Sequence, residues 1–179
     1  MENAGFTHVV KFPAVDGFAE SESFFQHLGI NEGSEGQKGC AASHLLAWKQ
    51  FLECDPREYL FIAEDDMIPL PSLKDIFPLF WEETPDHMDL IMVGHRNANE
   101  FKDTKIIRKP TLTTHAYIIS KKGAKKLLEK FYEPACKIKV PIDLFLCKLM
   151  ETNQIDYCCY NRGPLGLEEF KKISPKITI

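Results

Sequence analysis

The chain has 179 residues, of which 44% are hydrophobic and 27% charged, and its formal net charge is -4. This composition is typical of a globular domain with a sizeable core, and it holds no apolar run of about 18 residues that could cross a membrane. A net negative charge argues against a broad nucleic-acid surface, because phosphate binding relies on clustered Lys and Arg. We therefore expect a single domain over residues 1–179 with a peripheral tail (166–179), no nucleic-acid partner and no transmembrane segment.

The N-terminus and the cysteines indicate the compartment. The first ten residues, MENAGFTHVV, lack the basic and apolar blocks of a secretory signal. The six cysteines form no Cys-x-x-Cys pair and two of them are adjacent, which suits neither a zinc knuckle nor a disulfide framework. We expect reduced cysteines and a cytoplasmic protein, possible also at the cytoplasmic face of a membrane, in preference to the lumen of the endoplasmic reticulum.

The first third of the chain predicts strand, loop, helix and strand. Residues 8–15 have the composition of a short strand, and the glycines of 29–39 predict a loop. Apolar residues at helical spacing predict a helix over 40–53, which Asp55 and Pro56 end. The apolar run 59–63 predicts a buried strand.

The rest of the chain continues this alternation. A helix or a pair of turns interrupted by Pro78 is expected over 73–83, followed by strand 89–94, which we expect to be covered on both faces. Residues 105–110 and 112–120 resemble a hairpin or two edge strands. The remaining predictions are a helix over 121–132 with a solvated lysine face, a helix after Pro141, and strand 155–160. Alternating strands and helices predict an α/β fold, a mixed sheet flanked by helices.

Three consecutive carboxylates, Glu64, Asp65 and Asp66, follow strand 59–63. In an extended chain Glu64 and Asp66 would share one side, beyond the carboxyl end of a buried strand, where ligands bind in open α/β sheets. Paired hard oxygen ligands suit Mg²⁺ or Mn²⁺, and a cation would relieve the repulsion within the triplet. The alternative is a solvated acidic turn.

Five segments together resemble glycosyltransferase family 25, which includes lipooligosaccharide galactosyltransferases and collagen galactosyltransferases. They occur in the family's order and approximate spacing: PAVDG (13–17), GQKGCAASHLLAW (36–48), YLFIAEDD (59–66), THAYIISKKGAKKLL (114–128) and PID (141–143). The resemblance implies a glycosyltransferase-A-like fold, a UDP-sugar donor such as UDP-galactose, and inversion at the anomeric carbon. It also implies a divalent metal, Mn²⁺ or Mg²⁺, held by Glu64 and Asp66, and a glycan, glycolipid or hydroxylated protein as the acceptor.

The same segments supply the candidate site residues. Asp143 matches the family's Pro-x-Asp and is our candidate for the catalytic base; a helix-capping role is the alternative. Asp66 is the second catalytic candidate, through the metal. His44 could equally be a core histidine. The candidate donor-binding residues are Gly39, Ser43, His44, Glu64, Asp65 and His115.

The chain departs from the family pattern at its N-terminus. Family members open with a first strand and an LDR-like segment ahead of the helix before the AVDG turn, whereas Met1 begins at what resembles the end of that helix. Thr113 stands where the family often has Gly. Two hypotheses follow: a working glycosyltransferase, or a non-catalytic, truncated member that binds carbohydrate or a partner.

Overall fold

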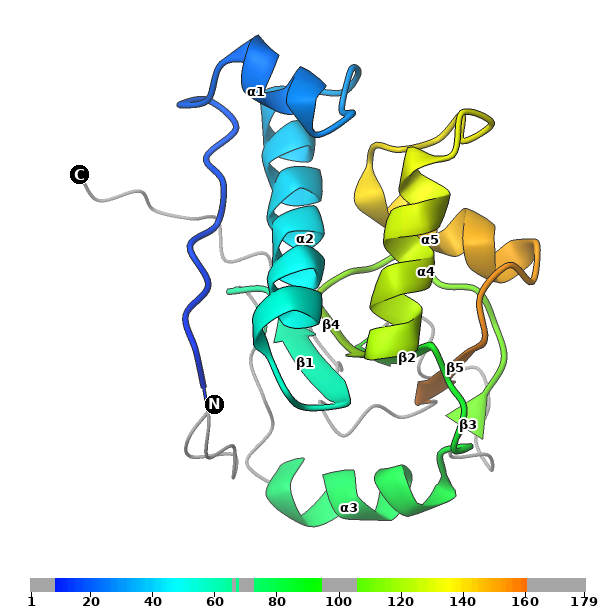
Figure 1. Cartoon of the computed structure of the whole chain (residues 1–179). Coiled ribbons are helices and arrows are strands. Elements are labelled where there is room, and N and C mark those ends of the chain that lie inside the picture. The colour runs from blue at the N-terminus through cyan, green and yellow to red at the C-terminus, as the bar shows by residue number, and fades with distance from the viewer. Residues whose placement is uncertain (1–8, 66, 68–72, 95–105, 161–179) are drawn as a thin grey trace.

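A computed structural model describes residues 9–65, 67, 73–94 and 106–160 (Figure 1). The described helices are α1 (Glu22–His27), α2 (Glu35–Cys54), α3 (Leu73–Glu83), α4 (Lys121–Tyr132) and α5 (Ile142–Glu151). The described strands are β1 (Tyr59–Ala63), β2 (Leu90–Gly94), β3 (Ile106–Ile107), β4 (Ala116–Ser120) and β5 (Tyr157–Tyr160). No helix in these ranges is long and apolar enough to cross a membrane.

The strands form one mixed sheet in the order β1-β4-β2-β5-β3. β4 runs antiparallel to both β1 and β2, and β5 runs parallel to β2. Ala116, the first residue of β4, is therefore paired with Ala63 and with Gly94, the last residues of β1 and β2. The carboxyl ends of β1, β2 and β5 and the start of β4 therefore lie at the same end of the sheet. This topology confirms the predicted mixed α/β architecture.

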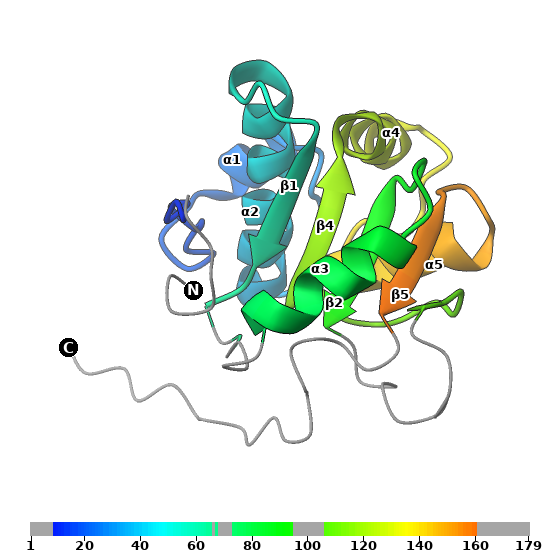
Figure 2. The ribbon, with the colours of Figure 1, turned by 90° about the horizontal axis from the view of Figure 1, so that it is seen from below.

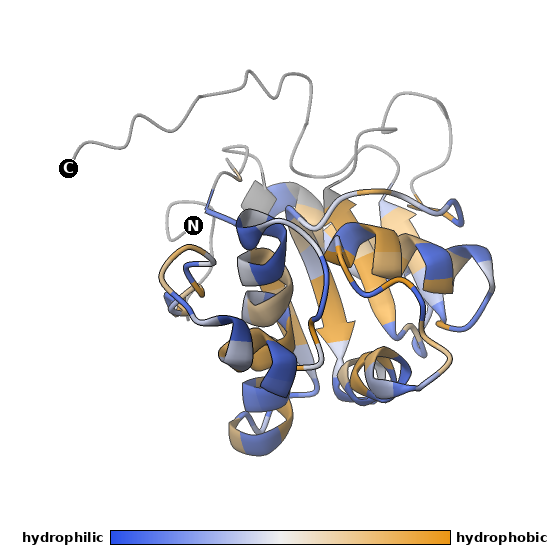
Figure 3. Ribbon diagram, turned by 90° about the horizontal axis from the view of Figure 1, so that it is seen from above, coloured by the Kyte–Doolittle hydropathy of each residue, from blue (hydrophilic) through white to orange (hydrophobic). Residues whose placement is uncertain are grey.

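Helices cover both faces of this sheet (Figure 2). Alternate residues of one strand belong to different cores: Leu90 and Met92 contribute to the larger cluster under α2, α4 and α5, whereas Ile91 and Val93 contribute to the cluster under α3. The strands are accordingly the most hydrophobic part of the ribbon (Figure 3). All four of these side chains are 0 or 1% exposed, which confirms that β2 is covered on both faces.

Helix α2 begins five residues earlier than the sequence predicted. Ser34 is its N-cap, and a capping box joins Ser34 to Gln37, whose side-chain oxygen accepts the N–H of Ser34 at 3.0 Å. This reciprocal pairing satisfies N–H groups that would otherwise be orphaned at the helix start. Residues 35–39, expected in a loop because of Gly36 and Gly39, are therefore helical.

Two strand predictions were wrong. Residues 9–15 form no strand, and the side chains of Val9 and Val10 are 46% and 76% exposed, because this segment has no sheet neighbour in the described part of the chain. The second was wrong only in part: β3 and β4 form no hairpin, and of the alternative, two edge strands, β3 is one and β4 is not. β4 lies inside the sheet between β1 and β2, while β3 pairs with β5 at the far edge. The uniformly buried residues of β4 are those of an inner strand.

The lysine-rich helix α4 is only partly a solvated face. Asp89, which is 0% exposed, accepts a hydrogen bond from Lys126, lies 3.3 Å from Lys122 Nζ and accepts the N–H of Asp156 at 3.0 Å. Gly123 allows α4 to start here, because a Cβ on it would lie 2.1 Å from the Asp89 carbonyl oxygen. Two of the lysines therefore anchor α4 to the end of the sheet opposite the acidic triplet.

Two smaller predictions hold. α3 is a single helix although Pro78 lies inside it. All six cysteines have free thiols, three of them buried in the core.

Candidate active site

The chain turns immediately after β1. The N–H of Glu64 donates to the His115 carbonyl at 2.9 Å, which extends the pairing with β4 by one residue, and the N–H of Met67 then donates to the Glu64 carbonyl at 3.2 Å. Asp65 therefore lies in a turn and not in the extended chain that we expected, and a shared side of Glu64 and Asp66 stays a prediction. Asp65 is exposed in this turn, and Asp66 lies outside the described residues.

The Glu64 carboxylate is held by three side chains. Its Oε1 accepts a hydrogen bond from the Thr114 hydroxyl and lies 3.4 Å from His44 Nε2, while its Oε2 lies 3.0 Å from His115 Nδ1. Burial alone would raise the pKa of Glu64, but hydrogen bonds from His115, His44 and Thr114 hold this pKa well below its usual value. Glu64 is therefore an ionised carboxylate of fixed orientation, 26% exposed at the side chain.

The His44 ring is fixed from inside the core. The indole N–H of Trp48 donates to the Tyr117 hydroxyl oxygen at 2.9 Å, and the same oxygen lies 2.7 Å from His44 Nδ1. Because indole nitrogen can only donate, the Tyr117 hydroxyl hydrogen is available to donate to Nδ1 of the His44 tautomer that carries its hydrogen on Nε2, directed at Glu64. Burial raises the pKa of Tyr117, so its hydroxyl keeps its hydrogen.

Cys40 lies one helical turn before His44 on α2. One ligand atom from each of Cys40, His44 and Glu64 can be chosen so that all three lie within 4.8 Å of one another. Burial raises the pKa of the Cys40 thiol to about 12, and the charges of Glu64 and Asp143 act in the same direction. With no metal bound, Cys40 is therefore a neutral thiol.

Asp143 is in the first turn of α5, which packs against α2. The cap residue of this helix is Pro141, so Asp143 is not the cap itself. It is partly buried, and its Oδ1 accepts the N–H of Leu144 at 2.8 Å. The negative charges of Asp143 and Glu64 both raise the pKa of the Cys40 thiol. Asp143 thus lies within electrostatic reach of Cys40.

Gly39 and Ser43 hold the segment before α1 against α2. A Cβ on Gly39 would lie 2.7 Å from the Val15 carbonyl oxygen and 2.8 Å from the Gly17 nitrogen. The Ser43 hydroxyl accepts the N–H of Val15 at 2.9 Å and donates to the Gly39 carbonyl at 2.8 Å. These contacts are internal to the chain, and a part for either residue in donor binding stays a prediction.

Two members of this cluster, Cys40 and Thr114, were not predicted as site residues, although they lie in the segments 36–48 and 114–128 that resemble the family. One signal could have found Cys40: together with His44 and Trp48 it follows four-residue spacing, which places all three on one helix face. The bond between His44 and Tyr117 joins residues 73 positions apart, and no local pattern predicts it.

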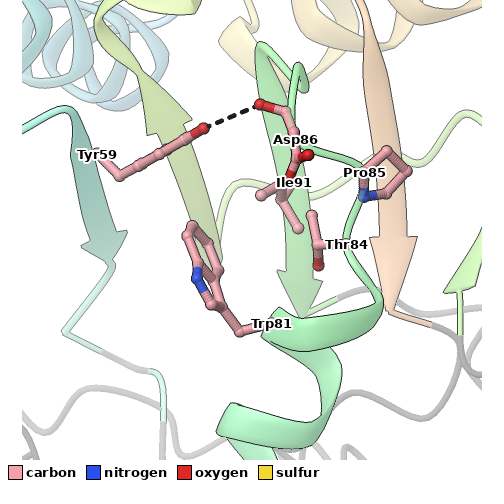
Figure 4. Close-up of a pocket in the computed structure, with 6 residues that line it drawn as sticks. All are labelled: Tyr59, Trp81, Thr84, Pro85, Asp86 and Ile91. Atoms are coloured by element: carbon pink, nitrogen blue, oxygen red, sulfur yellow. Dashed lines mark hydrogen bonds between the residues drawn. The ribbon is translucent and has the colours of Figure 1, made fainter.

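Two concavities of the described residues lie away from this cluster. A pocket of about 50 Å³ is lined by six residues, among them Tyr59, whose hydroxyl donates to the Asp86 carbonyl at 3.4 Å (Figure 4). A wider, apolar hollow of about 380 Å³ lies between α3 and the sheet and is lined by Phe61, Phe77 and Trp81, among others. Neither contains a residue of the acidic triplet, and the apolar lining suits packing rather than a nucleotide.

Comparison with known proteins adds to this geometry. A family model described as "Glycosyltransferase family 25 (LPS biosynthesis protein)" matches residues 18–146. The chain is 28% identical over 117 residues to a procollagen lysyl hydroxylase and glycosyltransferase of Acanthamoeba polyphaga mimivirus, an alignment that covers 58% of this chain and 13% of the relative. It is also 28% identical over 156 residues to a glycosyltransferase 25 family member of Aedes aegypti, covering 75% of this chain and 25% of the relative. No solved structure matches the chain. The alignments thus span only a quarter or less of these curated relatives.

Proposed function

The chain belongs to glycosyltransferase family 25, and on that premise we propose that it transfers a hexose, with galactose the expected sugar, from a UDP-sugar to an acceptor hydroxyl with inversion. The observation that carries the proposal is the ionised Glu64 carboxylate, held by Thr114, His44 and His115 at the mouth of β1. This is the edge of an open α/β sheet at which ligands bind. All four of these residues lie within the part of the chain that the family model matches.

A divalent cation, Mn²⁺ or Mg²⁺, is part of the proposal. The acidic triplet offers hard carboxylate oxygens, which are the ligands that these ions take. In this proposal Asp66 and its neighbour Asp65 contact the cation directly, and Glu64, whose oxygens face Thr114 and His115, positions the turn that carries them. When bound, the cation would supply countercharge for the leaving diphosphate.

The proposed catalytic base is Asp143. An inverting displacement needs a group that takes the proton of the acceptor hydroxyl on the side opposite the leaving group. Asp143 lies in the first turn of α5, within electrostatic reach of Cys40, and it is partly buried. His44 and His115 serve in this proposal as supports of Glu64 and as candidate donor contacts, since each ring has a nitrogen directed at that carboxylate.

The acceptor and the compartment follow from the relatives. The family model's description refers to lipopolysaccharide biosynthesis, which favours a glycan or glycolipid acceptor at the cytoplasmic face of a membrane. The name of the mimivirus relative includes procollagen lysyl hydroxylase, which makes a hydroxylated protein the second acceptor class to test. We propose the glycan acceptor first.

The test is release of UDP by the purified chain. UDP-galactose and UDP-glucose would each be incubated with Mn²⁺ and an acceptor mixture, and UDP would be measured for the wild type, Asp66→Ala and the control Asp86→Ala, in which an exposed acid distant from the triplet is removed. The expected result is release by the wild type and the control only. Equal, background-level release from all three proteins would overturn the proposal.

A further inference from the structure

We propose that Cys40, His44 and Glu64 form a binding site for a zinc-class metal ion between α2 and the end of β1. This site is separate from the proposed cation position at Asp65 and Asp66, and it does not depend on the transferase activity. Helix α2 supplies two ligands one turn apart, and the residue that follows β1 supplies the third. The site would therefore link a helix to the central sheet.

The three ligand atoms are close together, and one pair has the spacing of two ligands on a shared metal ion. One ligand atom from each residue lies within 4.8 Å of the other two. His44 Nε2 and Glu64 Oε1 are 3.4 Å apart, which is long for an N–H···O hydrogen bond, whose usual length is about 2.9 Å. Two ligands bonded to one tetrahedral zinc ion at about 2.0–2.1 Å are separated by about 3.3 Å, so this pair is already at the spacing that zinc requires.

Two of the three ligands have partners that orient them. His44 is fixed through Nδ1 by the Tyr117 hydroxyl, which Trp48 holds in turn. Glu64 is fixed by the Thr114 hydroxyl and by His115. Metal-binding histidines and carboxylates usually have such partners, which set the direction of the ligand atom before the ion arrives. In His44 one nitrogen faces the Tyr117 hydroxyl and the other is directed at the fixed Glu64 carboxylate.

The ligand types select the ion. A thiolate with an imidazole and a carboxylate suits Zn²⁺, whereas Mg²⁺ and Mn²⁺ prefer oxygen ligands alone. Three protein ligands leave the fourth tetrahedral position to water, and solvent can reach it because Cys40 is partly exposed and the Glu64 side chain is 26% exposed. Binding releases the thiol proton to solvent, and the His44 hydrogen moves from Nε2 to Nδ1, where the Tyr117 oxygen accepts it.

Cobalt titration of the purified chain tests this site without any activity measurement. Co²⁺ replaces Zn²⁺ in such sites and reports a thiolate ligand by a sulfur-to-metal charge-transfer absorption. We expect one equivalent of Co²⁺ to produce this absorption, Zn²⁺ to abolish it, and an excess of Mg²⁺ to leave it unchanged. Zn²⁺ should also raise the melting temperature, because it binds the folded chain preferentially.

The variants locate the ligands. Cys40→Ser should lose the absorption, and His44→Gln should weaken Co²⁺ binding at least tenfold, whereas the control Cys54→Ser, which alters an exposed thiol at the end of the same helix, should behave as wild type. Tyr117→Phe should weaken binding about tenfold, as for other partners of metal ligands. The absorption persisting unchanged in Cys40→Ser, or displacement of Co²⁺ by Mg²⁺, would overturn the site, and neither outcome bears on UDP release.

Discussion

The Tyr117 hydroxyl oxygen lies 2.7 Å from Nδ1 of His44, and this contact joins the inner strand β4 to the face of α2 that meets the acidic triplet. Tyr117 is 0% exposed and His44 is 5% exposed. The orientation of the His44 ring, and with it the hydrogen directed at Glu64, therefore depends on a residue deep in the core. The geometry of the Glu64 cluster therefore depends on how α2 packs against β4.

Tyr117→Phe should destabilise the fold although it removes a single oxygen. Trp48 Nε1–H and His44 Nδ1 would both lose their partner inside the core, and each buried unsatisfied group costs about 1–3 kcal/mol. Urea unfolding should show a loss of about 2 kcal/mol. In the control Tyr132→Phe, where the residue is 41% exposed, the change should stay within about 0.5 kcal/mol. Equal effects in the two variants would contradict the assigned hydrogen bonds.

Asp143→Asn should separate catalysis from donor binding. If Asp143 removes the acceptor proton, the amide cannot replace it, and kcat should fall by about 10²–10⁴-fold while the dissociation constant for UDP stays unchanged. The stability should change by less than about 1 kcal/mol, since the amide oxygen of Asn can still accept the N–H of Leu144 and only the charge in the first turn of α5 is lost. A kcat within threefold of wild type would remove Asp143 from the role of base.

Asp89→Asn should lower stability most at neutral pH. Burial alone would raise the pKa of Asp89, but Lys126, the N–H of Asp156 and Lys122 lower it. A carboxyl with a lowered folded pKa stabilises above its unfolded pKa of about 3.9, and this contribution disappears as the pH falls through the folded pKa. Asp89→Asn should therefore lose about 2–4 kcal/mol at pH 7.

The pH dependence is the decisive part of that measurement. As the pH is lowered below about 4, the difference between Asp89→Asn and wild type should shrink, and the exposed control Asp86→Asn should show no such trend. Unfolding free energies from urea titrations at several pH values would show it. A constant difference from pH 7 to acidic pH would mean that packing, and not charge, explains the loss.

The elements that the sequence predicted correctly are those whose signal is local. Apolar runs such as 59–63 and 90–94 predict strands, and helix 121–132 has both an apolar stripe and a clear start at Ser120. The expected burial of strand 59–63 was wrong, because β1 lies at the edge of the described sheet and all five of its residues are only partly buried. The failures needed knowledge of neighbours. Residues 9–15 have strand composition but no adjacent strand among the described residues, and the position of β4 inside the sheet depends on pairing with β1 and β2.

The candidate site was predicted in part for the same reason. The acidic triplet, His44, His115 and Asp143 stand out in the sequence, and the structure brings Glu64 into contact with both histidines. What the sequence could not reveal is how the Glu64 oxygens are occupied, because Thr114 and His44 reach them from segments 50 and 20 residues away. The structure therefore adds three partners to the Glu64 carboxylate, whereas metal binding by Glu64 and Asp66 stays a prediction.

Two glycines of α2, Gly36 and Gly39, should respond to alanine in opposite ways. A Cβ on Gly36 meets nothing within 4 Å, whereas a Cβ on Gly39 would lie 2.7 Å from the backbone oxygen of Val15. Gly36→Ala should stabilise the chain by about 0.5–1 kcal/mol through helix propensity. Gly39→Ala should destabilise it by about 1–3 kcal/mol, because the backbone of the loop before α1 must shift.

Because both changes add one methyl group to the same helix, each serves as the control for the other. Urea midpoints measured at equal m-values would give the two signs directly. Gly39→Ala should also weaken the hydrogen bond from the Val15 N–H to the Ser43 hydroxyl, because that hydroxyl in turn donates to the Gly39 carbonyl. Increased amide hydrogen exchange at Val15 in Gly39→Ala, but not in Gly36→Ala, is the expected local result. Stabilisation by both substitutions would show that the loop does not rest on α2 as described.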